Sequence, residues 1–158
     1  AYRSRWPHVA TDRVRKRLAG RAPTEAAAAS HYTPEFTART YTAVLEQAAS
    51  LLAAGHRAVL LDGNFPTASV REQTRAAAAA ADAAVTFVHV HVDVATAVAR
   101  AGHRAGDPRN TSDADADITR KLHARFEPPT DGEPDVVKVD GTAPTSHLAD
   151  DVLTRLLA

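Results

Sequence analysis

Short apolar runs alternate with segments of helical periodicity along this chain. The runs that favour buried β-strands lie at residues 8–10, 58–61, 85–92 and 136–139. The third run, VTFVHVHV, is rich in β-branched residues, which are common in strands. Segments with apolar positions three and four apart predict helices at residues 11–20, 34–54, 70–81, 94–104 and 146–157. Strands and helices that alternate in this way predict an α/β fold built on a parallel sheet.

The composition narrows the class of protein. The 158 residues suffice for a single domain, residues 1–158, and leave little room for two independent cores. The net charge is +0, with 19 Lys and Arg against 19 Asp and Glu, which argues against a dedicated nucleic-acid-binding protein. No apolar run approaches the roughly 18 residues that span a bilayer, so we expect a cytoplasmic protein. The chain has no Cys, which excludes disulfides, and no Met, so we expect that at least an initiator residue precedes Ala1.

Acidic residues come directly after three of the predicted strands. Asp12, Asp62 and Asp93 stand close behind the strands at residues 8–10, 58–61 and 85–92. Ligands of open α/β sheets bind outside the carboxyl ends of the strands, so these side chains are expected to converge on one crevice. The alternative is that each Asp stabilises the start of a helix, as Thr11 is also placed to do by capping the helix after residues 8–10.

Several segments resemble, in order, those of small P-loop kinases. The match is to the AAA-type ATPase or kinase domain that is often fused behind an aminoglycoside phosphotransferase-like domain, and zeta toxins and polynucleotide 5′-kinases are related. The segments are TDRVRKRLAG (11–20), YTPE (32–35) with RTY (39–41), GHRAVLLDGNF (55–65), RAGHR (100–104), SDAD (112–115) and ARFEPP (124–129).

The resemblance implies a three-layer P-loop NTPase-like parallel sheet, but no segment matches the phosphate-binding loop G-x-x-x-x-G-K-[ST]. The resemblance also implies the strand order 2-3-1-4-5, in which the first strand and the phosphate loop are absent from this chain. That strand would lie between residues 58–61 and 85–92, and its absence leaves about 9.6 Å between them. Either upstream sequence fills the space or the two strands pair with each other.

The resemblance assigns catalytic roles to the first two acidic positions. Asp12 matches the general base for the acceptor hydroxyl, and Arg15, on the same helical face, matches the residue that grips the substrate or the transferring phosphate. The alternative is a capped helix with a solvated Arg. Asp62 matches the acidic residue that lies near Mg²⁺. One or two carboxylates are enough to hold this ion in the protein. The alternative role of Asp62 is to cap the Asp62-Gly63 turn.

A lid segment at about residues 100–126 is the implied nucleotide contact. Arg100 and Arg104 lie four apart on one helix face, and the resemblance implies that they reach the phosphates of ATP, joined by Arg109 from a polar loop. In an Arg-rich chain the alternative is a solvated helix face. His89 and His91 share one side of a strand, but no third metal ligand is evident, so we assign them no function.

Two function hypotheses remain. The first is an ATP- and Mg²⁺-dependent kinase domain that phosphorylates an unidentified hydroxyl acceptor, a small molecule or a nucleic-acid end, with a fused upstream domain as one candidate partner. The second is a catalytically inactive remnant without a phosphate loop that serves as a binding or interaction domain. A nucleic-acid-binding module fits less well, because aromatic residues make up only 5% of the chain.

Overall fold

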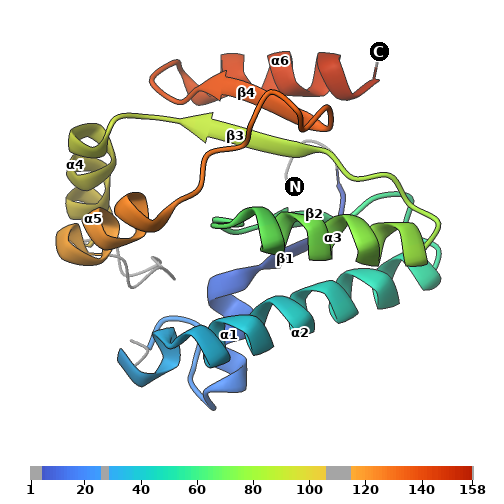
Figure 1. The fold of residues 1–158 in the computed structure, drawn as a ribbon, viewed down its shortest axis with the longest axis horizontal. Helices are drawn as coiled ribbons and strands as arrows, with labels where there is room; N and C mark the ends of the chain where they lie inside the picture. The colour runs from blue at the N-terminus through green and yellow to red at the C-terminus, as the bar shows by residue number, and fades with distance from the viewer. Residues whose placement is uncertain (1–4, 26–28, 106–114, 158) are drawn as a thin grey trace.

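The computed structural model describes residues 5–25, 29–105 and 115–157. Strands and helices alternate from the first element to the last (Figure 1), which confirms the predicted α/β class. The elements in chain order are β1 (His8–Ala10), α1 (Thr11–Leu18), a 3-10 helix (Ala29–Tyr32), α2 (Pro34–Ala53), β2 (Leu60–Asp62), α3 (Ala68–Ala80), β3 (Phe87–His91), α4 (Val94–Ala105), α5 (Ala116–Arg125), β4 (Val136–Asp140) and α6 (Thr145–Leu157).

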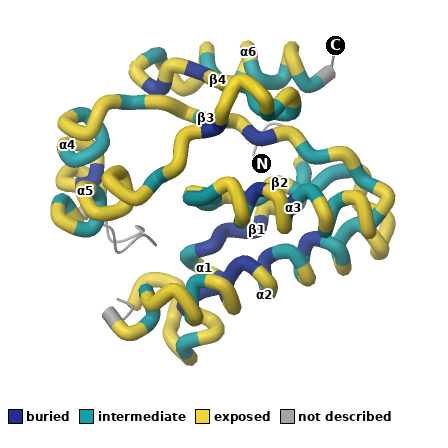
Figure 2. The backbone as a smooth tube through the Cα atoms, viewed as in Figure 1, coloured by how far each residue is buried: buried dark blue, intermediate teal, exposed yellow. Residues whose placement is uncertain are grey.

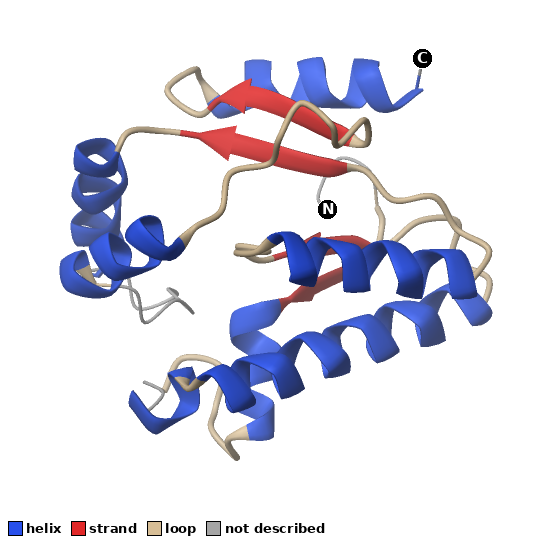
Figure 3. Cartoon of the chain, viewed as in Figure 1, coloured by secondary structure: helices blue, strands red, loops and turns tan. Residues whose placement is uncertain are grey.

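The strands form two separate parallel pairs rather than one continuous sheet (Figure 3). β1 pairs with β2, with Val9 opposite Leu61, and β3 pairs with β4, with His89 opposite Lys138. In the described residues β2 and β3 do not pair with each other, so the predicted alternative in which these two strands join is wrong. We call β1 and β2 the N-terminal pair and β3 and β4 the C-terminal pair.

The core is small and lies on the N-terminal pair. Val9, Val14 and Val44 come from β1, α1 and α2, and each is at most 3% exposed. Figure 2 shows the buried residues concentrated along β1 and the facing side of α2. By contrast, Leu60 on β2 and Val90 on β3 are 37% and 53% exposed. Apolar strand residues therefore remain accessible on the two strands that lack a common partner.

Local signals explain where the long helix α2 begins and ends. The Thr33 hydroxyl accepts a hydrogen bond from the Phe36 N–H at 3.2 Å, and Pro34 takes the first helical position, where its missing N–H costs nothing. Gly55, two residues after the helix, has a φ of +92°, which glycine adopts without steric cost. At α1 the expectation was wrong: Ala10 is the N-cap, and Thr11 is already the first helical residue.

Candidate active site

The carboxyl ends of β1 and β2 bring Asp12 and Asp62 to the same edge of the N-terminal pair. Asp62 is the last residue of β2 and lies opposite Ala10, two residues before Asp12. The next residues are in close contact, because a Cβ atom built on the backbone of Gly63 would lie 2.5 Å from Cγ2 of the Thr11 side chain. Real Cβ atoms do not approach so closely, so this junction requires glycine. The structure therefore places two of the residues that the sequence singled out at the carboxyl ends of neighbouring strands.

Asp62 has a partner that the sequence analysis missed. Its side chain is 67% exposed, and Oδ2 lies 3.3 Å from Nε2 of His8, an ion pair when the imidazole is protonated. His8 stands opposite Leu60, so it lies diagonally across the pair from Asp62. That diagonal relation becomes visible only once the register of the two strands is known, so no pattern along the chain could reveal it.

Arg15 is not a solvated side chain, so that alternative is wrong. It is 7% exposed, and its Nη1 donates to the His31 carbonyl at 2.7 Å and to the Thr37 hydroxyl at 3.3 Å. The guanidinium also lies 4.8 Å from the centre of the Tyr32 ring. Its Nε is buried without a hydrogen-bond partner in the described residues. The N-terminal half thus holds a buried positive charge one helical turn after Asp12.

Tyr41 of α2 connects these elements. It is 4% exposed, and its hydroxyl accepts a hydrogen bond from the Phe65 N–H at 2.9 Å. Phe65 belongs to the loop that follows Asp62 and has a φ of +43°. Burial raises the pKa of Tyr41, and the negative charge of Asp12 raises it further, whereas Arg15 and the bond to Phe65 oppose the change. Asp12, Arg15 and the loop after β2 are thus electrostatically coupled through Tyr41.

The predicted lid arginines lie on the other half of the molecule. Arg100 and Arg104 are exposed residues of α4, which packs against α5. Figure 1 shows α4 and α5 together beside the end of β3, apart from α1 and α2, so the structure does not bring these arginines to Asp12. Arg109 lies outside the described residues. Asp93 caps the start of α4, with Oδ1 accepting from the Thr96 N–H at 2.8 Å, so its alternative role is confirmed.

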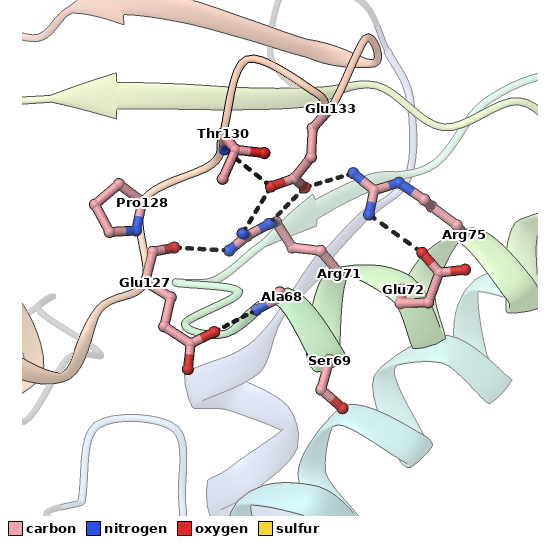
Figure 4. A pocket seen from close by; sticks show the side chains of 9 residues that line it. All are labelled: Ala68, Ser69, Arg71, Glu72, Arg75, Glu127, Pro128, Thr130 and Glu133. Carbon is pink, nitrogen blue, oxygen red and sulfur yellow. Dashed lines mark hydrogen bonds and ion pairs between the residues drawn. The ribbon is translucent and has the colours of Figure 1, made fainter.

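Four charged side chains, which we call the arginine cluster, join α3 to the loop before β4, and Figure 4 shows Arg71, Arg75 and Glu133 of this cluster. They are Arg71, Arg75, Glu133 and Asp135. Arg71 Nε lies 2.8 Å and Arg75 Nη2 lies 2.6 Å from Glu133 Oε2. Arg75 also binds both carboxylate oxygens of Asp135 at 2.8 Å. The two arginines hold the pKa of Glu133 at about 2. Sequence reasoning missed this cluster, because it joins residues about sixty positions apart.

The arginine cluster also fixes the segment after α5 against the loop that follows Asp62. Arg71 Nη1 donates to the Glu127 carbonyl at 2.9 Å and to the Phe65 carbonyl at 3.4 Å. The Glu127 carboxylate in turn accepts from the Ala68 N–H at 2.8 Å, at the start of α3. A pocket of about 500 Å³ borders these residues, and its charged groups already bind one another (Figure 4). We therefore regard it as a structural junction between the two halves.

The sequence analysis offered Asp62 as the single metal ligand. Among the described residues no three His, Asp or Glu side chains gather in a way that could hold a metal ion. A single exposed carboxylate at the end of a strand nevertheless suits Mg²⁺, which keeps several waters and takes further ligands from substrate phosphates. None of the helices within residues 5–25, 29–105 and 115–157 combines the length and the apolar character needed to cross a membrane.

Comparison with known proteins decides the family. Residues 2–129 match the model of an AAA domain. The chain belongs to this AAA domain family. No curated protein matches the sequence. Among solved structures, the AAA domain resembles a gluconokinase from Sinorhizobium meliloti 1021, at 19% identity and a TM-score of 0.66, over 98% of this chain and 78% of the gluconokinase chain. At this identity the likeness shows the fold, which is that of a P-loop kinase.

Proposed function

We propose that this AAA domain is the acceptor-binding and lid part of an ATP-dependent kinase that phosphorylates a hydroxyl group of a small molecule. The observation that carries the proposal is the position of Asp12 and Asp62 at the carboxyl ends of the neighbouring strands β1 and β2. Open α/β sheets bind their ligands at this edge. The kinase-like fold of the gluconokinase supports the reaction class but not a particular acceptor.

In this proposal Asp12 is the general base. A carboxylate that accepts the proton of the acceptor hydroxyl orients it for attack on the γ-phosphorus, and phosphoryl transfer needs little other covalent assistance. Arg15 supplies a positive charge one helical turn away, where it offsets the negative charge of the transferring group. Because Arg15 already binds the His31 carbonyl and the Thr37 hydroxyl, it also fixes the loop before α2 that borders the acceptor.

Asp62 would hold Mg²⁺ in this proposal. When bound, the ion neutralises charge on the phosphate oxygens. Arg100, Arg104 and Arg109 would contact ATP from the lid, where guanidinium groups can bind phosphate oxygens in pairs. These side chains do not complete an ATP site by themselves. ATP-binding kinases of this fold also need a loop of backbone N–H groups around the phosphates.

We propose that a polypeptide segment outside these 158 residues supplies the phosphate-binding loop. The sequence contains no G-x-x-x-x-G-K-[ST] segment, and β2 and β3 are not paired with each other in the described residues. Leu60, Val88 and Val90 on these strands are between 37% and 53% exposed. Unpaired strand edges with accessible apolar side chains are costly for an isolated protein, so a strand from that segment is expected to cover them.

The decisive experiment measures phosphoryl transfer by the protein purified from its own cells, with and without Asp12→Asn. The acceptors offered together with radiolabelled ATP are sugars, sugar acids including gluconate, and an oligonucleotide with a free 5′-hydroxyl. General-base catalysis contributes about 10²- to 10⁴-fold, so turnover should fall by at least about a hundredfold while ATP affinity is kept. Asp117→Asn, an exposed acidic residue of α5, is the matched control. Unchanged turnover in Asp12→Asn would exclude the base role.

A second candidate function is a non-catalytic binding domain, which the exposed apolar residues on β2 and β3 favour. Calorimetry with ATP and the 158-residue chain separates the two candidates. Sub-millimolar binding of ATP by this chain would contradict the binding-domain function. If neither the chain nor the natural protein binds ATP or transfers phosphate, the kinase proposal is wrong and a polypeptide partner for the strand edges should be sought.

A further inference from the structure

A second pocket lies on the C-terminal pair, away from Asp12 and Asp62. Its volume is about 350 Å³. It opens between one face of β3 and β4 and the segment that leaves α5, and it is lined by His89, His91, Lys138, Asp140 and the two prolines at 128 and 129. Nothing in the proposed kinase mechanism uses these side chains, and the pocket is separate from the arginine cluster.

The strand register explains why the polar side chains of this pocket gather there. His89 lies opposite Lys138, and His91 lies opposite Asp140. Alternate residues of a strand point to the same side, and paired residues of parallel neighbours share that side, so all four side chains stand on one face. The two imidazole rings are 5.9 Å apart, and the Phe126 ring lies 5.3 Å from His89. Three groups that can carry positive charge therefore line one small surface.

The carboxylates near this surface are already engaged. Asp140 accepts from the Thr142 N–H at 2.9 Å and from its hydroxyl at 2.8 Å. Asp131, whose side chain is fully exposed, binds Lys138 Nζ at 2.9 Å from outside the pocket. Burial lowers the pKa of His89, and so do the positive charges of His91, Lys138 and, from α3, Arg71. The charged groups that act on the His89 imidazole are thus positive, which disfavours a further cation beside it and favours an anion there.

His89 also has an unsatisfied polar atom. Its Nδ1 is buried and has no hydrogen-bond partner among the described residues. A buried nitrogen without a partner is costly, and such groups in native proteins are normally satisfied by protein, water or ligand. His91 is exposed, so the pocket is accessible from solvent. An open pocket, positive groups around His89 and an unsatisfied imidazole nitrogen are the features expected of a site for a small oxyanion.

We propose that this pocket binds a phosphate or carboxylate group, with the imidazole N–H groups of His89 and His91 and the ammonium group of Lys138 as donors. Charge-assisted hydrogen bonds of this kind are the strong ones. The group can come from a free anion or from a phosphorylated or carboxylated metabolite. The proposal does not depend on the kinase activity, because it uses neither Asp12 nor Asp62.

The test is an NMR titration of the imidazole resonances of the 158-residue chain with inorganic phosphate at low salt, where charge-assisted contacts are least screened. We expect saturable shifts of His89 and His91 and weaker binding as salt is added, because salt screens the attraction between the anion and Lys138. His147, an exposed histidine of α6, is the internal control and should show no saturable shift. Repetition with AMP and with gluconate identifies whether phosphate esters or carboxylates share the site.

Variants keep the test independent of folding. His89→Gln and Lys138→Met should each weaken phosphate binding by about tenfold, the loss expected for one charge-assisted hydrogen bond. Lys138 is half exposed, so Lys138→Met should fold normally, and Lys138→Arg should retain binding. Shifts that rise linearly with phosphate, that appear equally at His147, or that survive in Lys138→Met would overturn the proposal and leave water as the partner of His89. Asp12→Asn should leave phosphate binding unchanged, which separates this site from the proposed kinase function.

Discussion

Glu133→Gln removes one negative charge from the arginine cluster at almost constant side-chain size. Glu133 meets Arg71 through two contacts, at 2.8 and 2.9 Å, and Arg75 at 2.6 Å. Arg71 is only 2% exposed, so its charge loses its main partner in a place that water barely reaches. Removal of one partner from a buried ion pair typically costs about 3 to 5 kcal/mol, because the other charge is left uncompensated.

The pKa of Glu133 gives a second measure of this cost. The two arginines lower it from 4.5 to about 2. By linkage, that difference corresponds to about 3 kcal/mol in favour of the folded state at neutral pH. The Glu133 side chain is 14% exposed, so solvent screens it little. We therefore expect Glu133→Gln to lower the free energy of unfolding by about 3 kcal/mol, which is about 6 to 12 °C in Tm for a chain of this size.

Urea and thermal unfolding at pH 7, followed by circular dichroism, measure this change. The control is Asp117→Asn, which removes an exposed partner of Arg120 and should cost at most about 0.5 kcal/mol. A double-mutant cycle with Arg71→Gln isolates the pair itself. If Glu133→Gln costs no more than the control, the cluster does not hold the two halves together and the reasoning is wrong.

Further predictions concern pH and the candidate active site. The lowered pKa of Glu133 means that its contribution is complete above about pH 4.5 and is lost as the pH falls towards 2, so acid unfolding of Glu133→Gln should be less steep than that of the wild type. Gly63→Ala should cost about 1 to 3 kcal/mol in urea unfolding, because its Cβ would lie 2.5 Å from Thr11, whereas Gly132→Ala meets nothing closer than 3.7 Å and should be nearly neutral. Tyr41→Phe removes the partner of a backbone N–H, so its free energy of unfolding should fall by about 1 to 2 kcal/mol; no change would show that water replaces the hydroxyl.

The sequence predicted the elements that depend on neighbouring residues. The helix α2 followed from an apolar stripe between Pro34 and Gly55, because capping and periodicity are local properties. The start of α1 was displaced by one residue, since Ala10 has the extended backbone of an N-cap although Thr11 is the better capping side chain. The position of Asp12 and Asp62 at one edge followed from the strand ends, because parallel strands align their carboxyl ends at one edge.

Features that depend on pairing between distant residues could not be predicted. One of the two interpretations of Arg15 placed its side chain in solvent, where Arg usually lies. In the structure the loop before α2 folds over this side chain and buries it. The contact of His8 with Asp62 required the register of β1 and β2. The arginine cluster required knowledge of how α3 lies against the loop before β4. Charge and burial at these sites are properties of the assembled fold rather than of any segment.

The division of the strands into two pairs coincides with a division of the chain. β1, β2 and the helices α1–α3 all come before residue 81, whereas β3, β4 and the helices α4–α6 all come after residue 86. Each pair can therefore form from contacts within its own stretch of sequence, which favours fast folding of each part before the two dock. Native-state hydrogen exchange should then show two cooperative opening units, with the backbone amides of β1 and β2 protected together and those of β3 and β4 exchanging at a different free energy.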